Sequence, residues 1–193
     1  MTEIYPYSSH MPVLIGLSRM YKPRRILEFG AGQYSTPLFL NREVFSEVEL
    51  LHSLENGSTW KPRLEELAAG DSRLKLSFTD APLDKLVPGL NFADYDLVFV
   101  DDNPRSHQAV ADHCVPSNVI IIHDYNEVQY HPDHSPCDHL YESQAMWPST
   151  AIFWNQGWIS QKRLENMDWR IRHHAGETAI DDWVKWLMFM LTV

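Results

Sequence analysis

The residues best suited to chemistry lie between Arg25 and Thr36, in the stretch RILEFGAGQYST. Ile26–Phe29 is a short apolar run typical of a strand, and Pro37–Leu40 has the apolar character of a helix. Gly30 and Gly32 between them allow tight or left-handed backbone turns without a Cβ clash. A strand, a glycine turn and a helix together bring bare backbone close to a bound ligand, at the N-terminus of the helix.

An acidic residue, Glu28, stands two positions before the first glycine. A carboxylate in this turn would repel the diphosphate of a dinucleotide, whereas it would attract a ligand that carries a positive amino group. The alternative is an ordinary strand-to-helix turn with a surface glutamate, because short glycine motifs often occur without a function. The candidate site residues of this stretch are Gly30, Ala31, Gly32 and Ser35, and either Ser35 or Thr36 can cap the helix that follows.

Polar residues also follow the later apolar runs, which are Val48–Leu54, Leu74–Phe78, Leu97–Val100 and Val119–Ile122. The residues at these ends are Glu55 and Asn56, Asp80, Asp101 and His123. Ligands of an open α/β sheet bind beyond the carboxyl ends of its strands, so we expect these residues and Glu28 to surround one site. A carboxylate such as Glu55 can accept both hydroxyl protons of a ribose. Helix capping is the alternative for Glu55 and for Asp80.

The elements that must position these residues alternate along the chain. The later runs are continuous and rich in β-branched residues, which is typical of strands buried on both faces. Alternating strands and helices predict an α/β fold with a doubly wound, mostly parallel sheet and helices on both faces. The expected helices are Met11–Tyr21, Ser35–Leu40, Thr59–Ala69, Pro82–Leu86 and Ser106–Asp112.

The pattern changes after Asp124. We expect a variable loop over about 125–148, with a short helix near His139–Met146, and we expect this loop to border the pocket for a second ligand. Two further strands, Ser149–Trp154 and Trp169–His173, would bring the sheet to seven strands, and a terminal helix would cover Ala179–Leu191.

Length and composition fit a single domain over residues 1–193, and they exclude several classes of function. The formal net charge is −10 and no basic stripe is present, so nucleic acid is not an expected partner. The N-terminus lacks the features of a signal peptide, and two cysteines make no disulfide framework, which favours a cytoplasmic protein. The longest apolar run, Trp186–Val193, is too short to span a membrane, and the last helix suits core packing or a homodimer contact.

The stretch from Arg25 to Thr36 resembles motif I of the class I methyltransferases that use S-adenosylmethionine (SAM), whose pattern is acid-x-Gly-x-Gly. The resemblance covers about Met11 to His173. It implies a seven-stranded fold that binds SAM as methyl donor, with Glu28 and the backbone of Gly30, Ala31 and Gly32 at the methionine end. It also implies Glu55 and Asn56 at the ribose, followed by Trp60, and Asp80 at the adenine amino group.

The same resemblance extends to the ends of the fourth and fifth strands. Asp101 matches the acid that closes strand four, and His123-Asp124 is similar to the His-Asp pair that closes strand five in several small-molecule methyltransferases. The chain departs from the family pattern in two places. It has Asp102 where relatives often have glycine, and Val115-Pro116-Ser117-Asn118 where they have a Pro-Gly-Gly turn.

The expected activity is methyl transfer to an oxygen or nitrogen atom of a small molecule. His123 is the expected general base, because imidazole titrates near neutral pH. Asp101 would orient the donor or act as an alternative base. A SAM- or nucleoside-binding module without turnover is the alternative. A nicotinamide-dependent oxidoreductase is disfavoured by Glu28 and by the missing third glycine of the dinucleotide motif.

Two metal sites are conceivable, and we expect neither. Asp101 and Asp124 stand where catechol-type methyltransferases hold Mg²⁺, but Tyr125 occupies the place of the expected asparagine and Asn126 comes one residue later. The loop residues His131, His134, Cys137 and His139 have the residue types of a zinc site without its usual spacing, which favours a polar surface loop or a substrate lid.

Overall fold

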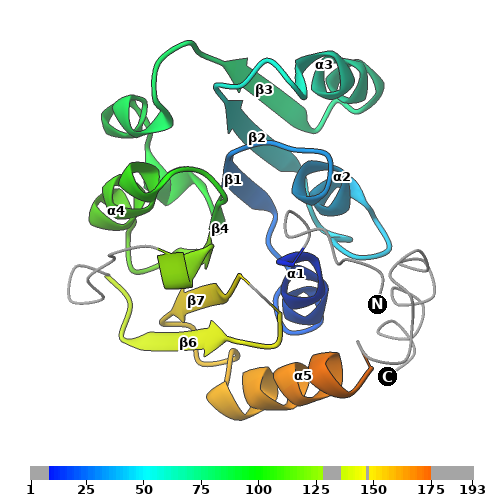
Figure 1. The fold of residues 1–193 in the computed structure, drawn as a ribbon, viewed down its shortest axis with the longest axis vertical. Coiled ribbons are helices and arrows are strands. Elements are labelled where there is room, and N and C mark those ends of the chain that lie inside the picture. Colours follow the sequence, from blue (N-terminus) through cyan, green and yellow to red (C-terminus); the bar gives the residue numbers. More distant parts are fainter. Residues whose placement is uncertain (1–8, 128–135, 147, 175–193) are drawn as a thin grey trace.

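Seven strands form one sheet in the computed structural model, which describes residues 9–127, 136–146 and 148–174. The strand order is β3-β2-β1-β4-β5-β7-β6 (Figure 1). Strands β1 to β5 are parallel, and β7 is antiparallel to both β5 and β6. The strands are β1 Arg25–Phe29, β2 Leu50–Glu55, β3 Leu74–Phe78, β4 Leu97–Val100, β5 Val119–His123, β6 His139–Ser143 and β7 Thr150–Trp154.

Helices cover both faces of this sheet. They are α1 Met11–Ser18, α2 Ser35–Leu40, α3 Lys61–Gly70, α4 Pro104–His113 and α5 Gln161–His174. One apolar cluster joins α1, α2 and α5 to the sheet, and a second joins the opposite face to α4 and to the 3₁₀ turns at Leu83–Lys85, Val87–Gly89 and Phe92–Asp94. Figure 1 shows α1, α2 and α3 on one side of the sheet and α4 on the other. The predicted doubly wound fold class is confirmed.

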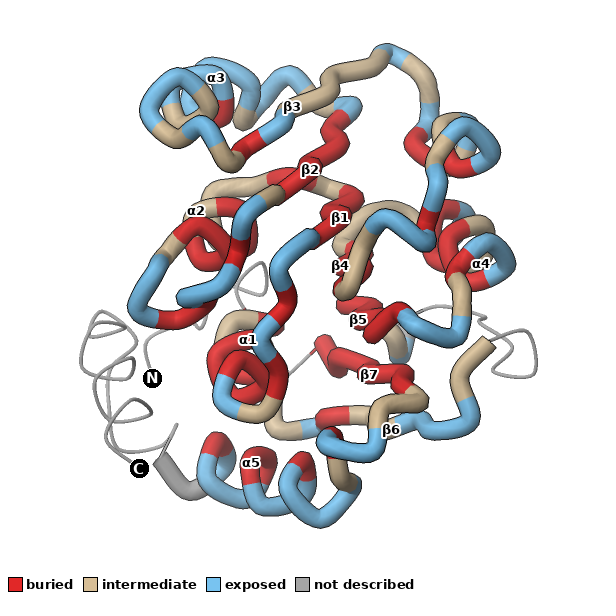
Figure 2. The backbone as a smooth tube through the Cα atoms, turned by 180° about the vertical axis from the view of Figure 1, so that it is seen from behind, coloured by how far each residue is buried: buried red, intermediate tan, exposed pale blue. Residues whose placement is uncertain are grey.

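The central strands are buried on both faces, as their continuous apolar sequences predict. Every residue of β4, β5 and β7 is buried, and only the first residue of β1 is exposed (Figure 2). The register also matches across the sheet. Phe29 lies opposite Leu54 and Val100, and Val100 lies opposite Ile122. The residues that follow these positions therefore gather at one edge.

The expected short helix near His139–Met146 is wrong, because His139–Ser143 forms the edge strand β6. Its residues pair with β7 in antiparallel register, with Leu140 opposite Phe153. The pairing gives the backbone its hydrogen bonds, and this tertiary contact is absent from the local sequence pattern. The variable loop predicted over about 125–148 is thus interrupted by a strand and by a 3₁₀ turn at Tyr125–Glu127.

The expected strand at Trp169–His173 is also wrong, because these residues belong to the helix α5. Leu164, Met167 and Ile171 are buried in α5, whereas Trp169 is 58% exposed. Their spacing of three and four residues is that of one helix face, and the aromatic Trp169 obscured it. The sheet does have seven strands, as predicted. Its remaining strand is β6 at His139–Ser143 and not the segment Trp169–His173.

The predicted helix over Pro82–Leu86 consists of 3₁₀ turns, and the one predicted over Ala179–Leu191 lies outside the described residues. Among the helices of the described ranges, none is long and apolar enough to cross a membrane.

Candidate functional site

The glycine turn after β1 is held by its neighbours in the sheet. Gly30 has a φ of +84°, and a Cβ atom on it would stand 1.9 Å from the backbone oxygen of Asp101, so only glycine fits there. The N–H groups of Gly30 and Ala31 donate to the Leu54 carbonyl at 3.0 and 3.1 Å. The expectation that this backbone is bare for a ligand is therefore wrong for these two N–H groups.

Gly32 differs, because a Cβ atom on it would meet no other atom within 4 Å. Its N–H donates to the hydroxyl of Thr36 at 3.1 Å. Glycine at this position is thus not required by the packing of the chain itself. It leaves open space beside the turn, where a ligand can approach the backbone closely.

Glu28 is fully buried beneath the turn, so the surface-glutamate alternative is wrong. Its carboxylate accepts hydrogen bonds from the hydroxyls of Ser35, Thr36 and Ser53 at 2.6, 2.9 and 2.5 Å. Burial raises the pKa of Glu28 to about 7, although the three hydroxyls act in the opposite direction. The carboxylate ties β1 to β2 and α2, and its direct contact with a ligand remains a prediction.

A cavity of about 490 Å³ opens at the carboxyl ends of β1, β2, β4 and β5. This volume is in the usual range for a small-molecule site. Six predicted residues line it, namely Gly30, Ala31, Gly32, Ser35, Glu55 and Asp101. The other lining residues are His10, Gln33, Tyr34, Thr59, Trp60, Asp102 and Asp124. Asn56 and Asp80 are exposed and do not line it, so their assigned contacts remain predictions.

A second cavity of about 450 Å³ adjoins the first between α2 and α3, and the two share Gly32, Gln33 and Trp60. The first is the better candidate for a chemical site, because the polar ends of the strands converge there. Trp60 is half-buried between the two cavities.

Glu55 is buried at the end of β2 and accepts a hydrogen bond from the Gly57 N–H. Burial raises the pKa of Glu55, and the nearby carboxylate of Asp102 adds to the effect. The capping alternative does not hold for α3, because that helix begins at Lys61 and the residue before it, Trp60, makes no side-chain capping bond. Glu55 instead closes the local turn and faces the cavity.

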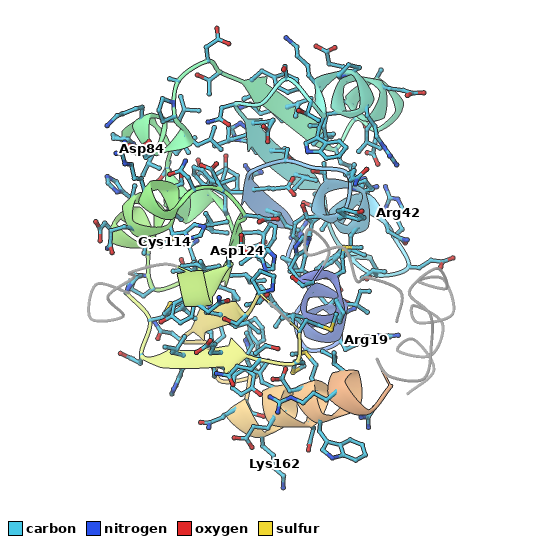
Figure 3. The ribbon with its side chains drawn as sticks, in the orientation of Figure 1. Arg19, Arg42, Asp84, Cys114, Asp124 and Lys162 are labelled. Atoms are coloured by element: carbon cyan, nitrogen blue, oxygen red, sulfur yellow. The ribbon has the colours of Figure 1, made fainter. Side chains whose placement is uncertain are left out.

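Three aspartates follow β4 and β5. Burial raises the pKa of Asp101 well above its usual range, and the carboxylates of Asp124, Glu28, Asp102 and Glu55 add to this rise in that order. Asp102 accepts from Asn103 and Ser106 at the start of α4, at 2.9 and 2.5 Å. Figure 3 places Asp124 near the middle of the molecule, where its backbone has a φ of 55° and burial raises its pKa. A ligand that carries a positive charge would offset the repulsion between these carboxylates.

His123 closes β5 and is only 2% exposed. Its Nδ1 lies 3.1 Å from the Thr150 hydroxyl, and its Nε2 lies 3.2 Å from both the Ser9 hydroxyl and Asp124 Oδ1. His123 is not among the residues that line the cavity. Its role as the general base remains a prediction.

Among the lining residues that the sequence analysis did not predict, His10 has the most unusual surroundings; it directly precedes α1. Its Nδ1 lies 3.5 Å from Asp101 Oδ2, and its ring meets that of His123 edge-on with centroids 4.7 Å apart. Burial lowers the pKa of His10, and the neighbouring His123 adds to this effect, so the ring is neutral at neutral pH. A lone histidine ahead of an apolar helix carried no signal in the sequence.

The other conceivable metal groups find less support among the described residues. The side-chain oxygen of Asn126 accepts the Ser149 N–H at 2.7 Å, so it is engaged away from the Asp101–Asp124 pair. Of the loop residues with zinc-ligand types, Cys137 contacts the Asn118 carbonyl and His139 stacks on Trp154. His131 and His134 lie outside the described residues.

No protein-family model matches the chain, and no curated protein matches it. Several solved structures are similar to it. The methyltransferase PaMTH1 of Podospora anserina, bound to S-adenosylhomocysteine (SAH), has a TM-score of 0.54 at 18% identity, over 75% of this chain and 77% of that one. A putative caffeoyl-CoA O-methyltransferase from Staphylococcus aureus has a TM-score of 0.53 at 12% identity, over 79% and 84% of the two chains.

A spermidine synthase in complex with a transition-state analogue is also similar, with a TM-score of 0.53 at 12% identity over 96% of this chain and 76% of that one. The sheet order, the antiparallel β7 and these similarities show that the chain has the class I methyltransferase fold. The presence of a synthase among them shows that the fold alone does not determine the reaction.

Proposed function

We propose that this protein transfers the methyl group of SAM to an oxygen or nitrogen atom of a small molecule. The observation that carries this proposal is the acidic cavity at the carboxyl ends of the parallel strands, with the glycine turn on its wall. A cavity at this edge is where α/β folds bind their ligands.

The lining residues fit SAM, which carries an amino group, a positive sulfonium and a ribose. Four acidic residues line the cavity and favour the positive charges of SAM: Glu55, Asp101, Asp102 and Asp124. Glu55 lines the cavity, where its carboxylate would accept hydrogen bonds from the ribose hydroxyls, and the open space at Gly32 would let the ligand approach the turn. The sulfonium of SAM supplies an activated methyl group, and the chain mainly has to align it with the acceptor.

The proposed acceptor is a small molecule because the chain offers little to a nucleic acid. A net charge of −10 and acidic cavity walls would repel a phosphate backbone. Where the acceptor must lose a proton, the groups at hand are Asp101 and His10 on the wall and His123 next to them.

Calorimetric titration with SAM, SAH and NAD tests the donor. We expect micromolar-class binding of SAH and none of NAD, and tighter binding of NAD than of either SAM compound would overturn the proposal. SAH formation with a panel of small oxygen and nitrogen nucleophiles then tests turnover. Binding of SAM without SAH formation from any acceptor would favour the non-catalytic binding module.

A further inference from the structure

We propose that His10, Asp101 and His123 together bind a divalent transition-metal ion of the Zn²⁺, Co²⁺ or Fe²⁺ type. One ligand atom from each of the three residues lies within 4.8 Å of the others. The three come from different parts of the chain, just before α1 and at the ends of β4 and β5. Two imidazoles and one carboxylate are a common set of ligands for such ions.

The spacing is close to what one ion requires. Ligand atoms about 2.1 Å from a shared tetrahedral ion stand about 3.4 Å apart. His10 Nδ1 and Asp101 Oδ2 are already at 3.5 Å, close to this value. The remaining separations, which reach at most 4.8 Å, need to close by up to about 1.4 Å. Side-chain rotations of the two histidines and the aspartate would have to supply this closure when the ion binds.

His10 is the observation that points to a ligand rather than to packing alone. Its side chain is 99% buried, yet within the described ranges neither ring nitrogen has a hydrogen-bond partner. Buried polar atoms in folded proteins are normally paired, with the protein or with a bound group. A ring nitrogen of His10 could therefore bind an ion together with Asp101 Oδ2.

His123 has the surroundings of a metal ligand. Its Nδ1 lies 3.1 Å from the Thr150 hydroxyl, a contact that fixes the ring orientation and directs Nε2 toward Ser9 and Asp124. Metal-binding histidines are usually oriented in this way through their second nitrogen.

Charge balance favours a cation at the same point. The cavity wall carries the carboxylates of Glu55, Asp101, Asp102 and Asp124, and its described lining contains no lysine or arginine. A divalent ion would neutralise part of this charge. The imidazole ligands favour transition metals over Mg²⁺, which prefers oxygen. This site therefore differs from the Asp101–Asp124 pair considered in the sequence, whose nearby Asn126 is engaged elsewhere.

The site lies on the wall of the proposed donor cavity, so its role in catalysis rests on the proposed function. A bound ion supplies Lewis-acid activation of an acceptor oxygen. His10, Asp101 and His123 would then act as ligands and not as proton acceptors, and the ion would replace His123 in activating the acceptor. Ion binding itself needs neither SAM nor an acceptor, and it can be measured separately.

The test titrates chelator-treated full-length protein with Co²⁺, followed by visible absorption, and with Zn²⁺ in competition with a chromophoric chelator. We expect one equivalent of either ion per chain, with no competition from millimolar Mg²⁺. His10→Gln and Asp101→Asn should each weaken binding by at least about 10–100-fold, the effect known for weaker perturbations of metal sites. His113→Ala removes an exposed histidine of α4 and should bind the ions as tightly as wild type.

Thermal melts and SAH calorimetry on the same variants separate a lost site from a lost fold. A folded His10→Gln chain that binds SAH but no ion supports the site. Wild type that binds less than a tenth of an equivalent, or both ligand variants binding as tightly as His113→Ala, would overturn it. Ion binding without any SAM or SAH binding would instead overturn the proposed function and leave the metal site standing.

Discussion

At the scale of single residues, Glu55 is the side chain whose removal should most directly weaken binding of the methyl donor. It is buried at the end of β2 and lines the cavity, so Glu55→Ala would leave ribose hydroxyls without an acceptor. We expect SAH binding to weaken by about 1–3 kcal/mol, measured by calorimetry. Glu43→Ala, which removes an exposed carboxylate, is the matched control. Equal affinities of the two variants would contradict a role for Glu55.

His123 should matter for the reaction and not for donor binding. We expect His123→Ala to lower the methyl-transfer rate by about 10²–10⁴ while SAH affinity stays close to that of wild type. The assay, run with a responsive acceptor across pH, includes a chelator arm. A wild-type rate that survives the chelator would favour His123 as a base, and a rate that the chelator abolishes would favour the ion. A near-wild-type rate in the variant would reduce His123 to a structural residue.

The sequence correctly placed at one edge of the sheet those candidate residues whose position follows from the strands. Glu55, Asp101 and His123 each close a parallel strand, and parallel strands end at one edge. The sequence could not predict His10, because its proximity to Asp101 depends on how α1 packs against the sheet. The sequence also could not show that Glu28 is buried. Its burial depends on hydrogen bonds from hydroxyls of β2 and α2, and the sequence of β1 does not predict these contacts.

At the scale of elements, the two glycines of the turn should respond in opposite ways. Gly30→Ala places a Cβ against the Asp101 backbone at a φ that disfavours side chains, so we expect a loss of at least about 1–3 kcal/mol of unfolding free energy. Gly32→Ala meets no atom within 4 Å, so stability should hold or rise slightly while SAH binding weakens. Chemical denaturation and calorimetry measure the two effects. Unchanged SAH affinity in Gly32→Ala would show that the ligand does not approach this turn.

Glu28 connects β1, β2 and α2, and its pKa makes that connection sensitive to pH. The folded chain holds the proton up to about pH 7, whereas an ordinary glutamate releases it near 4.5. The unfolded state therefore binds fewer protons between these values, and stability falls as the pH rises from about 4.5 to about 7. The Glu28 contribution to this fall is about 3 kcal/mol at most.

Denaturation of wild type and Glu28→Gln at a series of pH values measures this contribution. The glutamine does not ionise, so the variant should lose less stability over the same pH range. Other carboxylates with raised pKa values, such as Glu55 and Asp101, leave a residual slope in both proteins. Parallel stability curves for the two proteins would show that the carboxyl of Glu28 ionises normally in the folded state.

The sequence predicted elements where the local pattern and the tertiary contacts agree. β4 and β5 are continuous apolar runs that are buried on both faces, and both were identified. It was wrong where tertiary contacts decide, as in β6, whose half-exposed residues become a strand only by pairing with β7. In α5 the exposed Trp169 gave the local appearance of a strand, although buried residues recur at helical spacing.

At the scale of the whole molecule, topology could be derived because few arrangements of alternating strands and helices are allowed. The position of β7 between β5 and β6 was not derivable from periodicity, and the sequence analysis did not predict it. The acidic balance of the chain likewise became informative once the sheet brought its carboxylates to one cavity. Charge alone predicted that nucleic acid is not a partner, without indicating a ligand.

A ligand that binds only the folded chain should stabilise the whole molecule by mass action. At a concentration of SAH one hundred times its Kd, the gain is about 2.7 kcal/mol. For a chain of 193 residues this corresponds to a rise of about 5–10 °C in Tm, measured by differential scanning fluorimetry or calorimetry. Glu55→Ala should need about 5–150 times more SAH for the same rise, following its weaker binding. NAD should leave the Tm unchanged, and a larger rise with NAD than with SAH would assign the cavity to a dinucleotide despite the buried Glu28.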